Sequence, residues 1–156
     1  MKKILFLLFF IAVFPFIVPA QEIPDLKGRI NDYADMFSAE TEKALDEKLA
    51  ELEKTDSTQI SVLSVNSHEG YPIEEFSIKT ADKWKIGQKG KDNGVILLFS
   101  KNDRKIRIET GYGLEEKLTD LTAGRIIDNE ITPRFKAGQF DDGLSRGVDS
   151  LIAVVK

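Results

Sequence analysis

Apolar residues recur with helical spacing in two segments of the first half of the chain. Leucines spaced three and four residues apart follow Ser38, a good N-cap, and predict an amphipathic helix from there to about Lys54. Residues 73–86 carry a similar pattern, and Gly87 is expected to be the C-cap of this second helix. Each helix should therefore bury one face against the rest of the domain.

Three segments have the patterns of strands. Residues 59–65 are rich in β-branched side chains, and residues 94–99 form a continuous apolar run, as expected of a strand covered on both faces. Residues 105–110 alternate apolar and charged positions after a turn at Asn102 and Asp103, which predicts an antiparallel hairpin. Because a helix separates the first two strands, a right-handed crossover should pair them in parallel.

The two ends of the domain complete the predicted fold. Residues 21–37 read as an extended lead-in followed by a short strand or coil. Two helices are expected near the C-terminus, at about residues 120–135 and 141–155, with Pro133 kinking the first. The predicted fold class is α/β, a three-layer α/β/α sandwich with a small mixed sheet and helices on both faces.

The first twenty residues have the pattern of a secretory signal. Two lysines precede an almost unbroken apolar run, and small residues flank a cleavage point after Ala20. A retained membrane anchor is the alternative, but a spanning helix needs about 20 apolar residues, and Pro15 and Pro19 interrupt this run. We therefore expect residues 1–20 to be removed and residues 21–156 to form one domain, periplasmic or secreted, with no transmembrane anchor.

Charge and cysteine content exclude several functions. The formal net charge is −4 and becomes more negative when the two lysines of the signal are removed. An acidic domain is a poor match for nucleic acid or anionic lipid, whereas it is compatible with cations. The chain has no cysteine, which rules out disulfides, thiolate catalysis and zinc held by sulfur.

The predicted hairpin places two glycine-rich loops side by side. If the turn lies at Asn102 and Asp103, then Gly94 is opposite about Thr110, and the loop before the second strand lies beside the loop after the third. The oxygen-bearing side chains in or next to these loops are Asp92, Asn93, Glu109, Glu115, Glu116 and Asp120. Hard oxygen ligands on flexible loops suit calcium or magnesium. The alternative is that these residues are ordinary solvated turn formers.

Catalytic patterns are weaker. His68 is the only histidine, and no G-x-S-x-G elbow accompanies it, so a serine triad is not expected. No phosphate-binding loop is present.

The same central residues resemble a known family. The sequence is similar to the signature of the TPM-domain family, which includes a photosystem II repair phosphatase-like member and calcium-binding members. The segments that carry the resemblance are residues 30–32, 37–38, 84–95, 102–109, 111–115, 118–120 and 131–135. The similarity extends from about residue 28 to the C-terminus. It implies an α/β/α sandwich.

The resemblance also implies a site and two functions. By motif match, the acidic metal site would consist of Asp32, Asp92, Glu115 and Asp120. We expect an exported calcium-binding domain that serves as an interaction or maintenance module for envelope or membrane proteins. The alternative that the family suggests is a metal-dependent acid phosphatase in which Asp92 or Asp120 acts as a nucleophile or base beside a bound cation.

Overall fold

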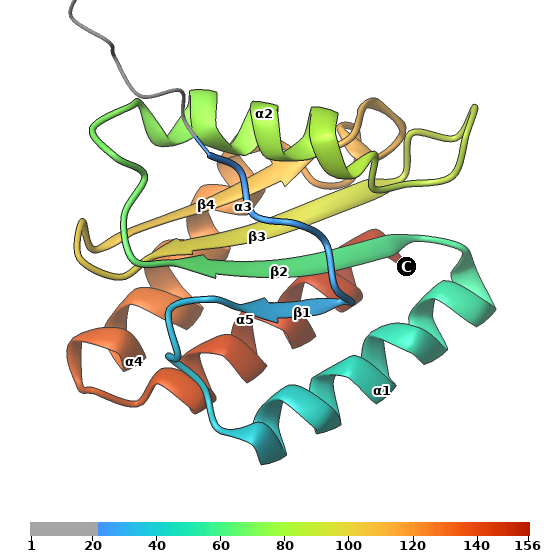
Figure 1. The fold of residues 1–156 in the computed structure, drawn as a ribbon. Helices are drawn as coiled ribbons and strands as arrows, with labels where there is room; N and C mark the ends of the chain where they lie inside the picture. The colour runs from blue at the N-terminus through green and yellow to red at the C-terminus, as the bar shows by residue number, and fades with distance from the viewer. Residues whose placement is uncertain (1–21) are drawn as a thin grey trace, which may run out of the picture.

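The computed structural model describes residues 22–156 of the chain (Figure 1). The predicted signal peptide and the predicted cleavage point after Ala20 lie outside the described residues, so export stays a prediction. The described residues form helices packed on both sides of one sheet.

The sheet has four strands in the order in which they occur along the chain, β1-β2-β3-β4. Their bounds are Ile30–Asp32, Gln59–Val65, Gly94–Ser100 and Lys105–Thr110. β1 and β3 each pair with β2 in parallel, whereas β3 and β4 form the antiparallel hairpin. The predicted parallel crossover and the predicted hairpin are both confirmed.

Helices cover the two faces of the sheet and make three layers. α2 lies alone on one face, and α1, α3, α4 and α5 lie on the other (Figure 1). The helices are α1 Ala39–Asp56, α2 Ile73–Trp84, α3 Asp120–Ile126, α4 Thr132–Lys136 and α5 Phe140–Val155, with η1 Tyr112–Leu114 and η2 Ile127–Ile131 as short helical turns. The predicted α/β/α sandwich with a mixed sheet is confirmed.

Alternating side chains of the central strands divide the core in two. All seven residues of β3 are buried, as the continuous apolar run predicts. Val62 and Leu97 pack against α1 and α5, while Leu63 and Leu98 pack against α2 and Trp84. Because successive side chains of a strand point to opposite faces, one strand pair supplies both halves of the core.

The second predicted helix ends earlier than its sequence suggests. α2 stops at Trp84, and Lys85 adopts the left-handed conformation with φ 52°, its N–H donating to the carbonyl of Ala81. Gly87 is therefore not the C-cap. It has φ 109°, and a Cβ at this position would lie 2.8 Å from the backbone nitrogen of Gly94. Gly87 serves a close approach of two chain segments instead.

The helix predicted at 120–135 is divided into three pieces. α3 is followed by η2, a π-helical turn in which the N–H of Thr132 donates to the carbonyl of Ile127. α4 then starts next to Pro133. Proline has no N–H to donate to the carbonyl four residues earlier, so the regular ladder cannot pass through this point.

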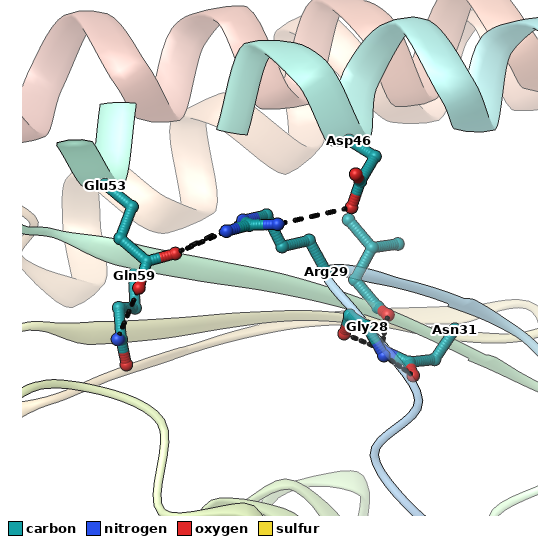
Figure 2. A network of polar contacts seen from close by, with 7 residues as sticks. Gly28, Arg29, Asn31, Asp46, Glu53 and Gln59 are labelled. Carbon is teal, nitrogen blue, oxygen red and sulfur yellow. Dashed lines mark hydrogen bonds and ion pairs between the residues drawn. The ribbon is translucent and has the colours of Figure 1, made fainter. Parts of the chain in front are cut away.

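A polar network fixes the edge strand β1 against α1 (Figure 2). Arg29, just before β1, lies between Asp46 and Glu53 of α1, at 3.7 and 2.8 Å. Gln59 of β2 donates to the other oxygen of Glu53 at 2.8 Å. The network holds the start of β1 in place, and with it the residues at the opposite end of this short strand.

Candidate functional site

The two glycine-rich loops meet, as the hairpin register predicts. Val95 pairs with Thr110, one position from the expected register, and the N–H of Gly111 donates to the carbonyl of Gly94 at 2.8 Å. The N–H of Gly113 donates to the carbonyl of Asp92 at 3.0 Å. A Cβ on Gly113 would lie 1.9 Å from a backbone oxygen of the facing loop, so the contact requires glycine.

Asn93 is used to shape its own loop. The residue is buried, and its side-chain oxygen accepts from the N–H of Gln88 at 2.8 Å. Its amide nitrogen donates to the carbonyl of Ser57 at 2.9 Å. The only oxygen that Asn93 could offer a cation through its side chain therefore already closes a turn.

Glu109 and Glu115 line one small cavity. This cavity of about 300 Å³ lies between α2, β4 and η1, and Asp82 also lines it. Glu109 accepts from the hydroxyl of Ser77 at 2.6 Å and pairs with Arg107 at 3.3 Å. Glu109 thus joins α2 to β4, whereas Glu115 is exposed.

The two catalytic candidates lie on the surface at this end of the sheet. Asp92 is exposed and has φ 47°, and its carbonyl holds the facing loop. Asp120 is exposed in the first turn of α3, which Thr119 caps. An acidic residue in a first helical turn has a structural reason in the helix dipole. Glu116 is exposed as well.

Asp32 lies at the opposite end of the sheet. It is level with Ser64 of β2, which in turn pairs with Phe99 near the end of β3. Phe99 is five residues from Gly94, a separation of about 17 Å along the strand. Asp32 therefore cannot share one ion with Asp92, and the predicted set of ligands divides between two places.

Within residues 22–156, no three carboxylate or imidazole groups are already arranged to hold a metal ion. At either end of the sheet, the side chains would have to move toward a cation to form a binding site. The donor chemistry at both ends still consists of carboxylates and backbone carbonyls, which fits calcium or magnesium.

The end at Asp32 gathers further acidic residues that the sequence did not single out. The carboxylate of Asp32 accepts from the N–H of Met36 at 2.8 Å, from the N–H of Phe37 at 2.9 Å and from the hydroxyl of Ser64. The carboxylate of Asp141, at the start of α5, accepts from the N–H of Ser38 at 2.8 Å. Together these bonds hold the loop between β1 and α1.

Glu42, in the first turn of α1, is affected by the charges of other acidic residues at this end. Partial burial raises the pKa of Glu42, and the neighbouring charges of Asp32, Asp35 and Asp141 raise this pKa further. We call Asp32, Asp35, Glu42 and Asp141 the acidic group. Glu42 and Asp141 lie in the first turns of α1 and α5. In the sequence, an acidic residue at such a position is already explained by the helix dipole, so neither residue suggested a site.

His68 is buried beside Asp103, away from the catalytic candidates. It is buried, and within the described part of the chain neither ring nitrogen has a hydrogen-bond partner. Its Nε2 lies 3.5 Å from the carboxylate of Asp103. The hydroxyl of Ser100, the N–H of His68 and the hydroxyl of Ser67 donate to Asp103 and lower its pKa to about 2. None of these contacts places His68 beside the catalytic candidates Asp92 and Asp120.

The layers and the sheet order define a small three-layer α/β domain with acidic residues at both ends of its sheet. The chain belongs to the TPM domain family, whose family model matches residues 30–154. The resemblance seen in the sequence is thereby confirmed. The match spans all four strands and nearly all of α5.

Solved structures support the same assignment. The N-terminal domain of a protein from P. gingivalis is 32% identical, with a TM-score of 0.75 and 80% of each chain covered. The BA42 protein from the psychrophilic bacterium Bizionia argentinensis is 24% identical, with a TM-score of 0.64 over 76% of this chain and 81% of the other.

A third structure shares the fold. The N-terminal domain of the cg2496 protein from Corynebacterium glutamicum is 14% identical, with a TM-score of 0.64 over 88% of this chain and 86% of the other. No curated protein matches the chain. Among residues 22–156, no helix combines the length and the apolar character that a membrane span requires.

Proposed function

We propose that this protein is an exported calcium-binding TPM domain that serves as an interaction or maintenance module for envelope or membrane proteins. The observation that carries the calcium proposal is the acidic group, where burial first and then the neighbouring carboxylates raise the pKa of Glu42. Like charges held together by a fold are destabilising, and a bound cation removes that repulsion.

Calcium fits this group better than magnesium does. Asp32 is held by the loop that it closes, while Asp35 is exposed and free to turn. Calcium accepts six to eight oxygens in a flexible arrangement, whereas magnesium demands a nearly ideal octahedron. Because the ligands are not preassembled, we expect a dissociation constant of about 10⁻⁴ to 10⁻³ M, typical of extracellular modules.

The other end of the sheet is the competing location for the ion. Asp92, Glu115 and Asp120 are exposed there, beside backbone carbonyls of two glycine-rich loops. Two of the other predicted ligands, Asn93 and Glu109, are already engaged in hydrogen bonds within the protein. Asp32 and Asp141 of the acidic group also accept hydrogen bonds within the protein, so the variants described below are needed to decide between the two ends.

Export and a role at the envelope rest on the N-terminal pattern and on the charge of the chain. Residues 1–20 have the features of a cleaved signal, and the negative net charge argues against docking on an anionic bilayer. A protein partner in the periplasm or outside the cell is therefore the expected target.

The alternative function, a metal-dependent acid phosphatase, has less support. It would need a nucleophile or an activated water beside groups that accept phosphate charge. Asp92 and Asp120 are exposed, and their observed roles are a loop contact and a helix start. An interaction module explains the same residues with fewer assumptions.

Calcium titration of the mature domain tests the proposal. We expect the melting temperature to rise in excess calcium and the backbone amides around Asp35 and Glu42 to shift. The double variant Asp35→Asn with Glu42→Gln should lose both effects, and asparagine tolerates the positive φ of 49° at position 35.

The matched control is the double variant Asp92→Asn with Asp120→Asn, which removes the same charge from the other end. This control should bind calcium like the parent. If instead only the control loses binding, the ion lies between the glycine-rich loops and the acidic group is excluded. An unchanged melting temperature in the parent would refute calcium binding altogether.

A further inference from the structure

A second, larger cavity lies at the end of the sheet that carries Asp32. It has a volume of about 580 Å³, within the range of small-molecule sites, and lies between the turn of the β3–β4 hairpin and the α4–α5 connection. These segments share one end of the molecule (Figure 1, left). Its apolar lining consists of Met36, Phe99, Ile106, Ile127, Phe135 and Phe140.

The apolar lining is aromatic at its centre. The rings of Phe99 and Phe135 are stacked with centroids 5.1 Å apart, and Phe140 meets Phe135 edge to face at 5.1 Å. Phe140 remains 40% exposed. The structure therefore leaves part of an aromatic cluster uncovered inside a hollow.

The rim of this cavity is cationic. Lys101, Arg104, Lys105 and Lys136 line it, and neither aspartate nor glutamate is among its described lining residues. Among the described residues, none of these four side chains forms an ion pair within 4.0 Å. Only Lys101 has a polar partner, the carbonyl of Ala34 at 2.9 Å.

This charge distribution is opposite to that of the whole molecule. The chain carries a net charge of −4, yet four unpaired cations surround one apolar hollow. A local positive field attracts anions and repels cations. The hollow also lies beyond the C-terminal end of the parallel strand β3, where ligands of α/β sheets commonly bind.

We propose that this cavity binds a small amphipathic anion, an alkyl or aryl carboxylate whose apolar body lies on the phenylalanine cluster and whose head meets the cationic rim. A fatty acid of medium chain length has this chemistry. The cavity adjoins the acidic group, since Met36 lines it and donates its N–H to Asp32. The proposed ligand is an anion, so the proposal goes beyond the proposed calcium function.

The lining also explains why a small molecule fits better than a peptide. The lysine and arginine side chains of the rim only donate hydrogen bonds, and the hydroxyl of Ser100 already donates to Asp103 at 2.6 Å, so the lining side chains offer few acceptors for the N–H groups of a peptide backbone. Buried backbone groups without partners are costly. A single charged head on an apolar body demands only what the rim supplies.

Titration with decanoate below its micellar concentration tests the proposal. We expect saturable shifts of the amides of Arg104, Lys136 and Gly138, and weaker binding at higher salt because the head group is held by exposed cations. The neutral 1-decanol and the cation decyltrimethylammonium keep the apolar tail and should bind at least tenfold more weakly. Acetate keeps the head alone and should not bind measurably.

Variants localise the effect. Arg104→Gln with Lys136→Gln should weaken decanoate about tenfold or more, since each charge-assisted contact is among the stronger ones. Lys54→Gln with Lys89→Gln removes the same charge from exposed positions elsewhere and should leave binding unchanged.

Three results would overturn the proposal. They are equal binding of decanoate and decanol, the absence of shifts around the cavity, and an acidic aromatic peptide that binds more tightly than decanoate. The titration is run in a chelator so that its outcome is independent of calcium. Decanoate binding with no calcium response, or the reverse, would separate the two proposals.

Discussion

Asp103 shows how one surface carboxylate can organise two segments. Three donors from β3 and from the loop after β2 converge on it and lower its pKa to about 2. The native state therefore favours the ionised form. This stabilisation is complete above the unfolded pKa near 3.8 and is lost as the pH falls through about 2.

We expect Asp103→Asn to lower the melting temperature at neutral pH. The difference in melting temperature between variant and parent should shrink from pH 4 to pH 2, because the parent carboxylate becomes protonated and loses its charge. Melting curves at several pH values measure it. Glu116→Gln, at an exposed position, is the control, and a difference that persists unchanged at pH 2 would contradict the assignment.

The pKa of Glu42 is shifted in the opposite direction to that of Asp103. Its pKa is raised, so the folded state binds its proton more readily than the unfolded state does, and the ionised form is destabilising at neutral pH. Glu42→Gln should therefore stabilise the calcium-free protein at pH 7 by up to about 1 kcal/mol after allowance for solvent screening. The gain should vanish below about pH 4.5, where the parent side chain is protonated too.

Calcium should reverse this effect, because the glutamine variant loses a ligand. Denaturant unfolding with and without calcium measures both signs in one series. Stabilisation that is equal in the two conditions would mean that Glu42 does not take part in cation binding.

At the scale of elements, a glycine-to-alanine substitution, which adds one methyl group, tests the contact between the glycine-rich loops. Gly113→Ala places a Cβ against the backbone oxygen of Lys91 and should cost about 1–3 kcal/mol of unfolding free energy. Gly124→Ala is the matched control, since nothing lies within 4 Å of its Cβ and alanine favours the helix by about 1 kcal/mol. Equal destabilisation by both variants would contradict the close approach of the loops.

Local patterns predicted the central elements well. The apolar run of β3 and the alternation in β4 depend on residues near in sequence, and the hairpin turn fixes their register. The predicted end of α2 was wrong because the left-handed residue that ends the helix is Lys85, which carries no special sequence signal, and not Gly87. The sequence predicted a kink at Pro133. It did not predict that the hydrogen bonds before this proline would form the π-helical turn η2 between α3 and α4.

The candidate site was predictable only in part. The meeting of the glycine-rich loops followed from the hairpin, and the structure contains it. Asp32 entered the predicted ligand set through family resemblance, and its position depends on the parallel pairing of a three-residue strand. Asp35, Glu42 and Asp141 come together only when the starts of α1 and α5 pack against that strand's end, which no local pattern reveals.

At the scale of the whole molecule, export makes a direct prediction. Cleavage after Ala20 should leave a secreted or periplasmic protein that begins at Gln21. The intact mass of the protein recovered from the periplasm or medium measures this. Replacement of Leu8 by arginine would interrupt the apolar run and should hold the chain in the cytoplasm, whereas a recovered protein that still begins at Met1 would contradict cleavage.

The order of the strands leaves the sheet open at both sides, and the two outer strands differ from the inner ones. β1 has only three residues, and β4 places Lys105, Arg107 and Glu109 at alternating positions. An unpaired strand edge is a template on which further chains can add, and shortness and charge are two ways to prevent such growth. A domain exported as we propose, away from the chaperones of the cytoplasm, would gain from this arrangement a resistance to aggregation through its own edges.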